Sequence, residues 1–326
     1  MKFQDQLLIK SESPINEDYS CRPEDRDIET YINYGIINLD KPKGPTSHEV
    51  VTWVRKILGV QKTGHGGTLD PKVTGILPCA IGKSTKAVSY LLNSKKEYVC
   101  VIFFHSPISE RQIRNLFSLF TGKIYQRPPL KSSVARKLRV REIYYNKILE
   151  IQGQYVLFRV GCQAGTYIRK LCFDLGEALC SGAHMVELRR TKSSVFEENK
   201  ILITLQNLKD AVTIFREEGD EYYLRKVIQP LEIITESFPK IFVRDSAVDA
   251  LCHGANLTSP GILYVDASIQ KGTVVAIMTQ KKELIAFGTA LKSGMKIYKA
   301  NSGIMVKINR VFMKRRTYPR WTEFKK

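Results

Sequence analysis

The sequence contains no Cys-x-x-Cys pair, although it has 7 cysteines. They are scattered along the chain: Cys21, Cys79, Cys100, Cys162, Cys172, Cys180 and Cys252. An odd number without close spacing argues against both a disulfide framework and a zinc site. Free thiols fit a reducing compartment, the cytosol or the nucleus.

Long apolar runs are also missing. The run from Tyr98 to Phe104 is about the longest, whereas a membrane helix needs about 18 to 20 apolar residues. The N-terminus lacks the apolar core of a signal peptide. We therefore expect no association with a membrane.

Acidic residues are few beside basic ones. The 326 residues include 51 Lys and Arg against 32 Asp and Glu, which gives a net charge of +19. Residues 240–326 alone hold 16 Lys and Arg against 5 Asp and Glu. A globular chain this basic usually binds a polyanion, most often nucleic acid. The length suits two domains, or one large domain with an appendage.

The residue pattern indicates a mixture of strands and helices, and the composition of the segments changes after residue 239. Residues 1–34 are polar and read as an extension. We expect strands at 35–40, 98–104 and 155–160, and helices from Ser47 as N-cap, at 84–92 and from near Thr166. After residue 239, short Val- and Ile-rich runs alternate with Gly and Pro turns, which predicts a small β-barrel.

The densest motif is the glycine-rich segment 64–75. Its four glycines allow close approach of a ligand to the backbone. Asp70 precedes Pro71, which favours an extended backbone and presents the carboxylate as a nucleophile or base; the alternative is an aspartate that caps a turn. His65 can hold a substrate phosphate or base, or be a structural hydrogen-bonding residue.

Gly82-Lys83-Ser84 resembles the end of a phosphate-binding loop. That pattern also needs a glycine at position 77, where the chain has Leu77. We therefore exclude an ATPase or GTPase.

Three further features are candidates for function. Arg169, near the start of a helix, can hold a carboxylate ionised, or be a solvated surface arginine. Tyr98, at the start of a strand, can stack on a base, or simply pack in the core. The segment 131–141 alternates cations with apolar residues, which is typical of an exposed loop and an edge strand with one basic face. This face can bind phosphates, or it can simply be solvated.

Taken together, these motifs resemble the TruB-type pseudouridine synthases. The matching segments are 35–42, 64–75, 96–99, 126–130, 165–169 and 184–190, in family order. The strings at 47–51, 138–141, 223–225, 245–248 and 317–320 are similar to the branch that works as the catalytic subunit of H/ACA ribonucleoproteins.

The resemblance implies an α+β fold in several parts. A pseudouridine synthase domain with a central mixed, mainly antiparallel sheet is expected at 35–238. A small β-barrel-like PUA domain is expected at 239–318. The extension 1–34 is expected to pack on the PUA domain, and 319–326 to form a short basic tail.

The resemblance also implies the site residues. By motif position, Asp70 is the catalytic aspartate, Tyr98 stacks on the target uracil and Arg169 is the partner of the aspartate. Leu188 is expected to pack against the site, and His65 to contact the strand of the displaced nucleotide. The basic residues expected to bind RNA are Arg136, Lys137, Lys314, Arg315, Arg316 and Arg320.

The implied function is RNA-guided isomerisation of uridine to pseudouridine in ribosomal and small nuclear RNA, in support of rRNA processing and ribosome biogenesis. Isomerisation adds no group and changes no oxidation state, so no cofactor and no metal is expected. The implied partners are an H/ACA guide RNA, substrate rRNA and three small core proteins: the glycine-arginine-rich subunit, the small subunit docking on the catalytic domain and the kink-turn-type subunit. The implied location is the nucleus and nucleolus.

Two alternatives remain: a stand-alone tRNA pseudouridine synthase and a catalytically silent RNA-binding scaffold. The presence of Asp70 and Arg169 argues against the scaffold. Whether Asp70 attacks the ribose or the uracil, or stabilises a ribosyl cation, stays open. Gly66 stands where the family commonly has Ser, which predicts a looser loop. No long Lys-rich tail follows, which leaves the nuclear import route open.

Overall fold

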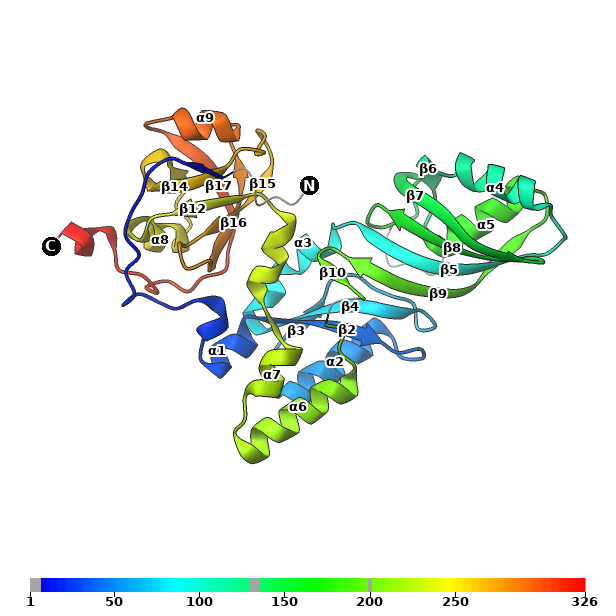
Figure 1. Cartoon of the computed structure of the whole chain (residues 1–326), viewed down its shortest axis with the longest axis horizontal. Helices are drawn as coiled ribbons and strands as arrows, with labels where there is room; N and C mark the ends of the chain where they lie inside the picture. Colours follow the sequence, from blue (N-terminus) through cyan, green and yellow to red (C-terminus); the bar gives the residue numbers. More distant parts are fainter. Residues whose placement is uncertain (1–6, 129–134, 199–200, 326) are drawn as a thin grey trace. The chain divides into compact units, whose positions relative to one another are not determined.

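The computed structural model describes residues 7–128, 135–198 and 201–325 (Figure 1). The chain divides into two compact units. The first comprises Met1–Ile36, Ile81–Lys86 and Ile228–Lys326, and the second comprises Ile37–Ala80 and Ala87–Val227. Asp70, Tyr98 and Arg169 all belong to the second unit.

One large sheet has most of its strands in the second unit. Its strand order is β11-β2-β4-β9-β5-β8-β7-β6, with β10 pairing β9 and β3 pairing β4. Strands β4 and β9 are parallel, whereas β9–β5, β5–β8, β8–β7 and β7–β6 are antiparallel. The expected mixed, mainly antiparallel sheet is therefore confirmed. The strands are β2 (Gly35–Lys41), β3 (Thr63–His65), β4 (Thr74–Ile81), β5 (Lys96–Phe104), β6 (Gly122–Gln126), β7 (Arg139–Gln152), β8 (Tyr155–Cys162), β9 (Ala183–Ser193), β10 (Phe196–Glu197) and β11 (Gln229–Pro230).

Helices α4 and α5 cover one face of β5, β7 and β8 (Figure 1). Leu171 and Leu175 of α5 are fully buried there, and Phe117 of α4 packs edge-on against Phe158 of β8, with ring centroids 5.0 Å apart. This packing fixes α5, and with it Arg169, relative to β5, which carries Tyr98. The helices are α2 (Ser47–Leu58), α3 (Val88–Leu92), α4 (Glu110–Leu119), α5 (Ile168–Ala178), α6 (Leu205–Glu218) and α7 (Tyr222–Val227).

Helix α2 has a different N-cap from the one that the sequence indicated. Thr46 is its N-cap, and Thr46 and Glu49 form a capping box. Ser47 is the first helical residue, and its side chain bonds the backbone of Leu69 instead. The expectation that Ser47 is the cap is wrong because the neighbouring hydroxyl caps the helix.

Other expected elements differ in detail. The strands expected at 35–40, 98–104 and 155–160 are β2, β5 and β8. The helix expected at 84–92 is a 3₁₀ segment, Gly82–Ala87, followed by α3. Of the basic stretch 131–141, residues 131–134 lie outside the described part of the chain, and β7 begins only at Arg139.

The first unit contains a second sheet with the order β1-β14-β12-β15-β16-β17-β13. Its buried core includes Ile241, Val265, Ile277 and Ile285. The strands are β1 (Leu7–Ile9), β12 (Lys240–Val243), β13 (Leu257–Thr258), β14 (Ile262–Asp266), β15 (Val274–Met278), β16 (Leu284–Ala290) and β17 (Ile304–Val311). The helices are α1 (Ile28–Asn33), α8 (Asp245–Cys252) and α9 (Gly294–Lys299), with 3₁₀ segments at Pro23–Asp25, Leu231–Ser237, Ser259–Gly261 and Trp321–Lys325.

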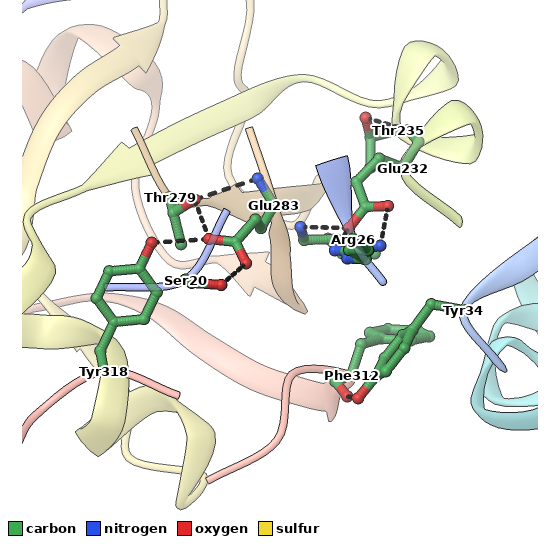
Figure 2. A network of polar contacts seen from close by, with 10 residues as sticks. Ser20, Arg26, Tyr34, Glu232, Thr235, Thr279, Glu283, Phe312 and Tyr318 are labelled. Atoms are coloured by element: carbon green, nitrogen blue, oxygen red, sulfur yellow. Dashed lines mark hydrogen bonds and ion pairs between the residues drawn. The ribbon is translucent and has the colours of Figure 1, made fainter. Parts of the chain in front are cut away.

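The N-terminal segment packs on this second sheet. Strand β1 pairs antiparallel with β14, and the buried Glu283 accepts hydrogen bonds from Ser20 at 2.5 Å and from Tyr318 at 2.7 Å (Figure 2). Burial raises the pKa of Glu283, and these bonds oppose the rise. Arg26 forms a bidentate pair with Glu232, at 3.0 and 2.7 Å. Segments from both ends of the chain therefore meet on one sheet.

Candidate active site

Asp70 and Arg169 form an ion pair. Arg169, the second residue of α5, donates from Nη2 to Oδ2 of Asp70, which lies in the loop between β3 and β4. The side chains of Asp70 and Arg169 are 51% and 55% exposed, respectively, so the pair is open to solvent.

Buried side chains fix the backbone on both sides of Asp70. Ser47 Oγ donates to Leu69 O at 3.0 Å and accepts from Leu69 N at 2.8 Å. Lys41 Nζ donates to the carbonyls of Pro71 and Val73 at 3.0 and 2.9 Å. Asp70 is therefore held by its neighbours while its own carboxylate stays accessible.

Lys41 is a site residue that the sequence reasoning missed. Its side chain is fully buried, and this burial lowers its pKa while the nearby Asp70 opposes the change. The signal in the sequence was a lysine at the last position of a buried strand, directly before Pro42. A buried cation is stable only with several acceptors, and the carbonyls around Asp70 supply them.

Tyr98 and Leu188 lie in the hydrophobic cluster next to the Asp70 loop. They are 9% and 8% exposed, and the same cluster contains Leu69 and Val73. Burial raises the pKa of the Tyr98 hydroxyl, and the Arg190 guanidinium opposes this. Most of the Tyr98 ring is therefore packed in the core close to the ion pair, with a small part of the side chain left exposed, and its hydroxyl stays protonated at neutral pH.

His65 ends β3, and its Nδ1 is buried with no hydrogen-bond partner among the described residues. Burial, and to a smaller extent the charges of Arg190 and His48, lower the pKa of His65. The imidazole is therefore neutral at neutral pH and can accept or donate a hydrogen bond.

The glycine at position 66 permits close packing rather than a looser loop. Its N–H donates to Pro78 O at 2.9 Å, and a Cβ at this position would lie 2.8 Å from Leu91 Cβ. Gly66 itself is buried. The expected loosening is therefore wrong for this chain, because the loop is pressed against α3.

Two buried basic side chains lie near this loop: Arg190 bonds the loop itself, and Lys96 bonds the end of α3 that packs against it. Arg190 donates to Ile76 O at 2.7 Å and to Gly67 O at 3.0 Å. Lys96 Nζ donates to Leu91 O at 2.8 Å and to Ser94 O at 2.9 Å. Burial, with a contribution from Arg190, lowers the pKa of Lys96 to about 7.

Each of the two units carries part of the expected RNA-binding cations. Arg136 and Lys137 are exposed in the second unit, where Arg136 Nε donates to Pro128 O at 3.3 Å. In the first unit the segment after β17 carries a further group: Lys314, Arg315, Arg316 and Arg320. Cationic side chains facing solvent are suited to phosphate contacts.

A cavity of about 540 Å³ opens beside the ion pair, and Arg169 forms part of its wall. Within residues 7–128, 135–198 and 201–325, no group of three or more His, Cys, Asp or Glu side chains is arranged to hold a metal ion. In the same part of the chain, no helix is both long and apolar enough to cross a membrane.

Residues 55–168 match the TruB family pseudouridylate synthase N-terminal domain, and residues 169–236 match the tRNA pseudouridylate synthase B C-terminal domain. Residues 239–312 match the PUA domain, and residues 1–51 match the DKCLD (NUC011) domain. The chain belongs to the TruB family of pseudouridylate synthases, and it is a pseudouridine synthase.

Curated relatives are similar to this chain over nearly its whole length. A "Probable tRNA pseudouridine synthase B" of Archaeoglobus fulgidus is 51% identical over 96% of this chain and 96% of its own. That of Methanopyrus kandleri is 52% identical over 97% and 93%.

Solved structures that contain the archaeal dyskerin Cbf5, together with the DKCLD match, place this chain in the dyskerin branch of the family. The chain in "Crystal Structure of a Cbf5-Nop10-Gar1 Complex" is 51% identical, with TM-score 0.91 over 97% of this chain and 96% of that one. The chain in "Structure of H/ACA RNP bound to a substrate RNA containing 2'-deoxyuridine" is 47% identical, with TM-score 0.92 over 98% and 99%.

Proposed function

We propose that this chain is the catalytic subunit of an H/ACA ribonucleoprotein and isomerises guide-selected uridines in RNA. The observation that carries the proposal is the Asp70–Arg169 ion pair, on a loop whose backbone is fixed on both sides. The likeness to chains solved with H/ACA components supports the guided form of the reaction.

The reaction exchanges one bond for another within the same nucleotide. The bond from N1 of uracil to C1′ of ribose breaks, and a bond from C5 to C1′ forms. C5 loses a proton and N1 gains one, so no electrons are transferred and no further reactant is consumed. Such a reaction needs a positioned carboxylate and a site that holds the base as it turns.

Asp70 is the carboxylate in this proposal. It attacks the ribose or the uracil, or stabilises a ribosyl cation. Each of these routes uses its carboxylate as a charged group, and the Arg169 guanidinium lies directly beside it. Since both side chains are about half exposed in the free chain, the bound RNA completes the exclusion of water and strengthens the charge interactions.

Tyr98, Leu188 and His65 hold the displaced nucleotide. The target base must leave its duplex before it can react, and an aromatic ring such as that of Tyr98 can capture it by stacking. Leu188 forms the apolar support beside Tyr98. His65 contacts the strand that the base leaves.

Guide RNA and small proteins supply specificity. The proposed partners are an H/ACA guide, substrate ribosomal and small nuclear RNA, and core proteins equivalent to Nop10 and Gar1, with which similar chains have been solved. The kink-turn-type subunit, the role in rRNA processing and ribosome biogenesis, and the location in nucleus and nucleolus stay predictions. So do the domain boundaries after residues 34, 238 and 318.

A stand-alone tRNA pseudouridine synthase is the second candidate. The curated relatives bear that name, which favours it. An assay of the purified chain on a tRNA stem-loop and on an rRNA-like oligonucleotide separates the two. The guided proposal expects conversion of the rRNA target only with a matching guide and the small proteins, and efficient conversion of the tRNA by the lone chain would favour the second candidate.

A further inference from the structure

A β-bulge interrupts the ladder between β5 and β9 at the position of Tyr98. Glu97 of β5 lies opposite Lys192 of β9, whereas the next residue, Tyr98, lies opposite Arg190. Thr191 is therefore the extra residue of the bulge. If the register at Glu97 continued regularly, Thr191 would lie opposite Tyr98, and Arg190 would face the other side of the sheet. Bulges are common next to active sites, where they change the direction of a side chain.

A cluster of hydrogen bonds joins three strands at this bulge. Glu97 is 6% exposed, and its carboxylate accepts from the Thr191 hydroxyl at 2.7 Å and from the Tyr145 hydroxyl of β7. Burial, together with the bond to Glu97, raises the pKa of Tyr145, although Arg159 opposes the rise. The Tyr145 hydroxyl therefore keeps its proton and donates it to the hydrogen bond.

Tyr145 reaches Glu97 by crossing a whole strand. It lies opposite Gly161 of β8, which in turn lies opposite Glu97 of β5. A Cβ at position 161 would lie 2.3 Å from Cε1 of Tyr145, so the ring passes directly over this glycine, whose lack of a side chain permits the approach. A half-exposed tyrosine thus bonds a buried carboxylate two strands away.

The bulge directs two side chains toward the candidate site. Tyr98 packs in the hydrophobic cluster beside the Asp70 loop. Arg190 donates to Ile76 O and to Gly67 O, and these two residues flank Asp70 in the sequence. Arg190 also lies near enough to Tyr98 to oppose the rise in its pKa that burial causes. The strand geometry at the bulge therefore affects both the ring and the loop.

We infer that Tyr145, Glu97 and Thr191 form a positioning cluster for the isomerisation. They maintain the bulge, and the bulge holds Tyr98 and Arg190 in the geometry that the reaction needs. Removal of either hydroxyl leaves a buried oxygen of Glu97 without that partner, so β5 is expected to shift at the bulge. The inference rests on the proposed function, because it takes Tyr98 as the residue that captures the target base.

The test separates positioning from stability. Tyr145→Phe removes one hydroxyl and keeps the ring, whereas Thr191→Val removes the second hydroxyl and Thr191→Ser keeps it. Tyr144→Phe is the matched control, because Tyr144 is the adjacent tyrosine on the same strand. Each chain is assembled with guide RNA and the small proteins to measure single-turnover rate and RNA affinity. Urea unfolding and the ¹⁵N NMR signal of Arg190 Nε, assigned with Arg190→Lys, are measured on the full chain alone.

Tyr145→Phe and Thr191→Val are expected to lower the single-turnover rate about 10-fold, since small displacements of reacting groups are costly, and to shift the Arg190 signal. RNA affinity should stay close to wild type, because phosphate contacts supply much of it. Thr191→Ser should restore both the rate and the signal, and Tyr144→Phe should change neither.

An unmoved Arg190 signal in Tyr145→Phe would overturn the inference, whatever the rate. A loss of stability in Tyr145→Phe with a wild-type rate would also overturn it, since the cluster would then serve folding alone. Failure of the wild-type complex to convert the guided uridine would count against the proposed function instead, while the Arg190 signal still tests the cluster.

Discussion

Ser47 and Leu69 exchange two hydrogen bonds, from Ser47 Oγ to Leu69 O at 3.0 Å and from Leu69 N to Ser47 Oγ at 2.8 Å. The contact ties the first turn of α2 to the residue that precedes Asp70. Ser47 therefore positions Asp70 indirectly, through the backbone of the preceding residue.

Ser47→Ala is expected to lower turnover and stability together. Removing the hydroxyl leaves a buried N–H and a buried carbonyl without partners, at a cost of about 1–3 kcal/mol, and frees the Asp70 loop. Thr46→Ala is the control, because it removes the capping box, for about 1 kcal/mol, but leaves the Leu69 contacts. Urea unfolding and single-turnover rates measure the two effects; equal rates for both variants would contradict the positioning role of Ser47.

Substitution of Arg169 tests the ion pair. Arg169→Ala is expected to reduce the rate of pseudouridine formation by about 10-fold or more, since the carboxylate loses its cation. Arg169→Lys is expected to recover part of the rate, because the charge returns without the planar fork. Single-turnover assays with saturating RNA measure the chemical step, and a wild-type rate for Arg169→Ala would remove the pair from the mechanism.

Lys96 gives stability a pH dependence. Its pKa falls from 10.5 to about 7 on burial, so between these values the unfolded chain binds a proton that the folded chain does not. Stability is therefore expected to rise with pH across this window, by at most about 1.4 kcal/mol per pH unit from this group. Below about pH 7 both states are protonated and the contribution is flat.

Urea unfolding at several pH values compares the wild type with Lys96→Met and Lys95→Met. Lys96→Met is expected to show a smaller rise above neutral pH. Lys95→Met is expected to keep the rise, since Lys95 lies 4.5 Å above the Tyr144 ring and leaves Lys96 in place. Parallel curves for all three proteins would refute this source of the pH dependence.

The basic segment after β17 is expected to set the salt dependence of guide binding. The variant replaces Lys314, Arg315, Arg316 and Arg320 by Gln and so removes four cations from this segment. Log K falls as log salt rises. For each phosphate that the variant no longer neutralises, this negative slope should become shallower by about 0.7–0.9. Filter binding at several salt concentrations measures the slope, with Lys209→Gln on α6 as control; an unchanged slope in the fourfold variant would exclude the segment from the RNA interface.

Much of the fold and the main site residues could be predicted because their signals are local. Apolar runs marked β5 and β8, and the order of the glycine-rich and arginine motifs identified Asp70 and Arg169 as candidates. Their ion pair joins residues far apart in the sequence, and only the resemblance to a family indicated it.

The supporting residues were missed for a physical reason. Ser47 and Lys41 bond backbone atoms of distant segments, and the positions of backbone acceptors cannot be read from the pattern of side chains. Ser47 in particular matched a helix N-cap, and Thr46 took that place instead. The prediction for Gly66 was wrong because close packing against Leu91 depends on tertiary structure.

The most direct test of the central claim is the yield of pseudouridine at one guided uridine, with wild type and with Asp70→Asn. The complexes contain guide RNA, the small proteins and an rRNA-like oligonucleotide, and RNA affinity and urea unfolding are measured on the same samples. The account predicts that Asp70→Asn lowers the rate by orders of magnitude, because the nucleophile is lost, while binding and stability stay close to wild type. Pseudouridine formation at a wild-type rate by a folded, RNA-binding Asp70→Asn chain would contradict it.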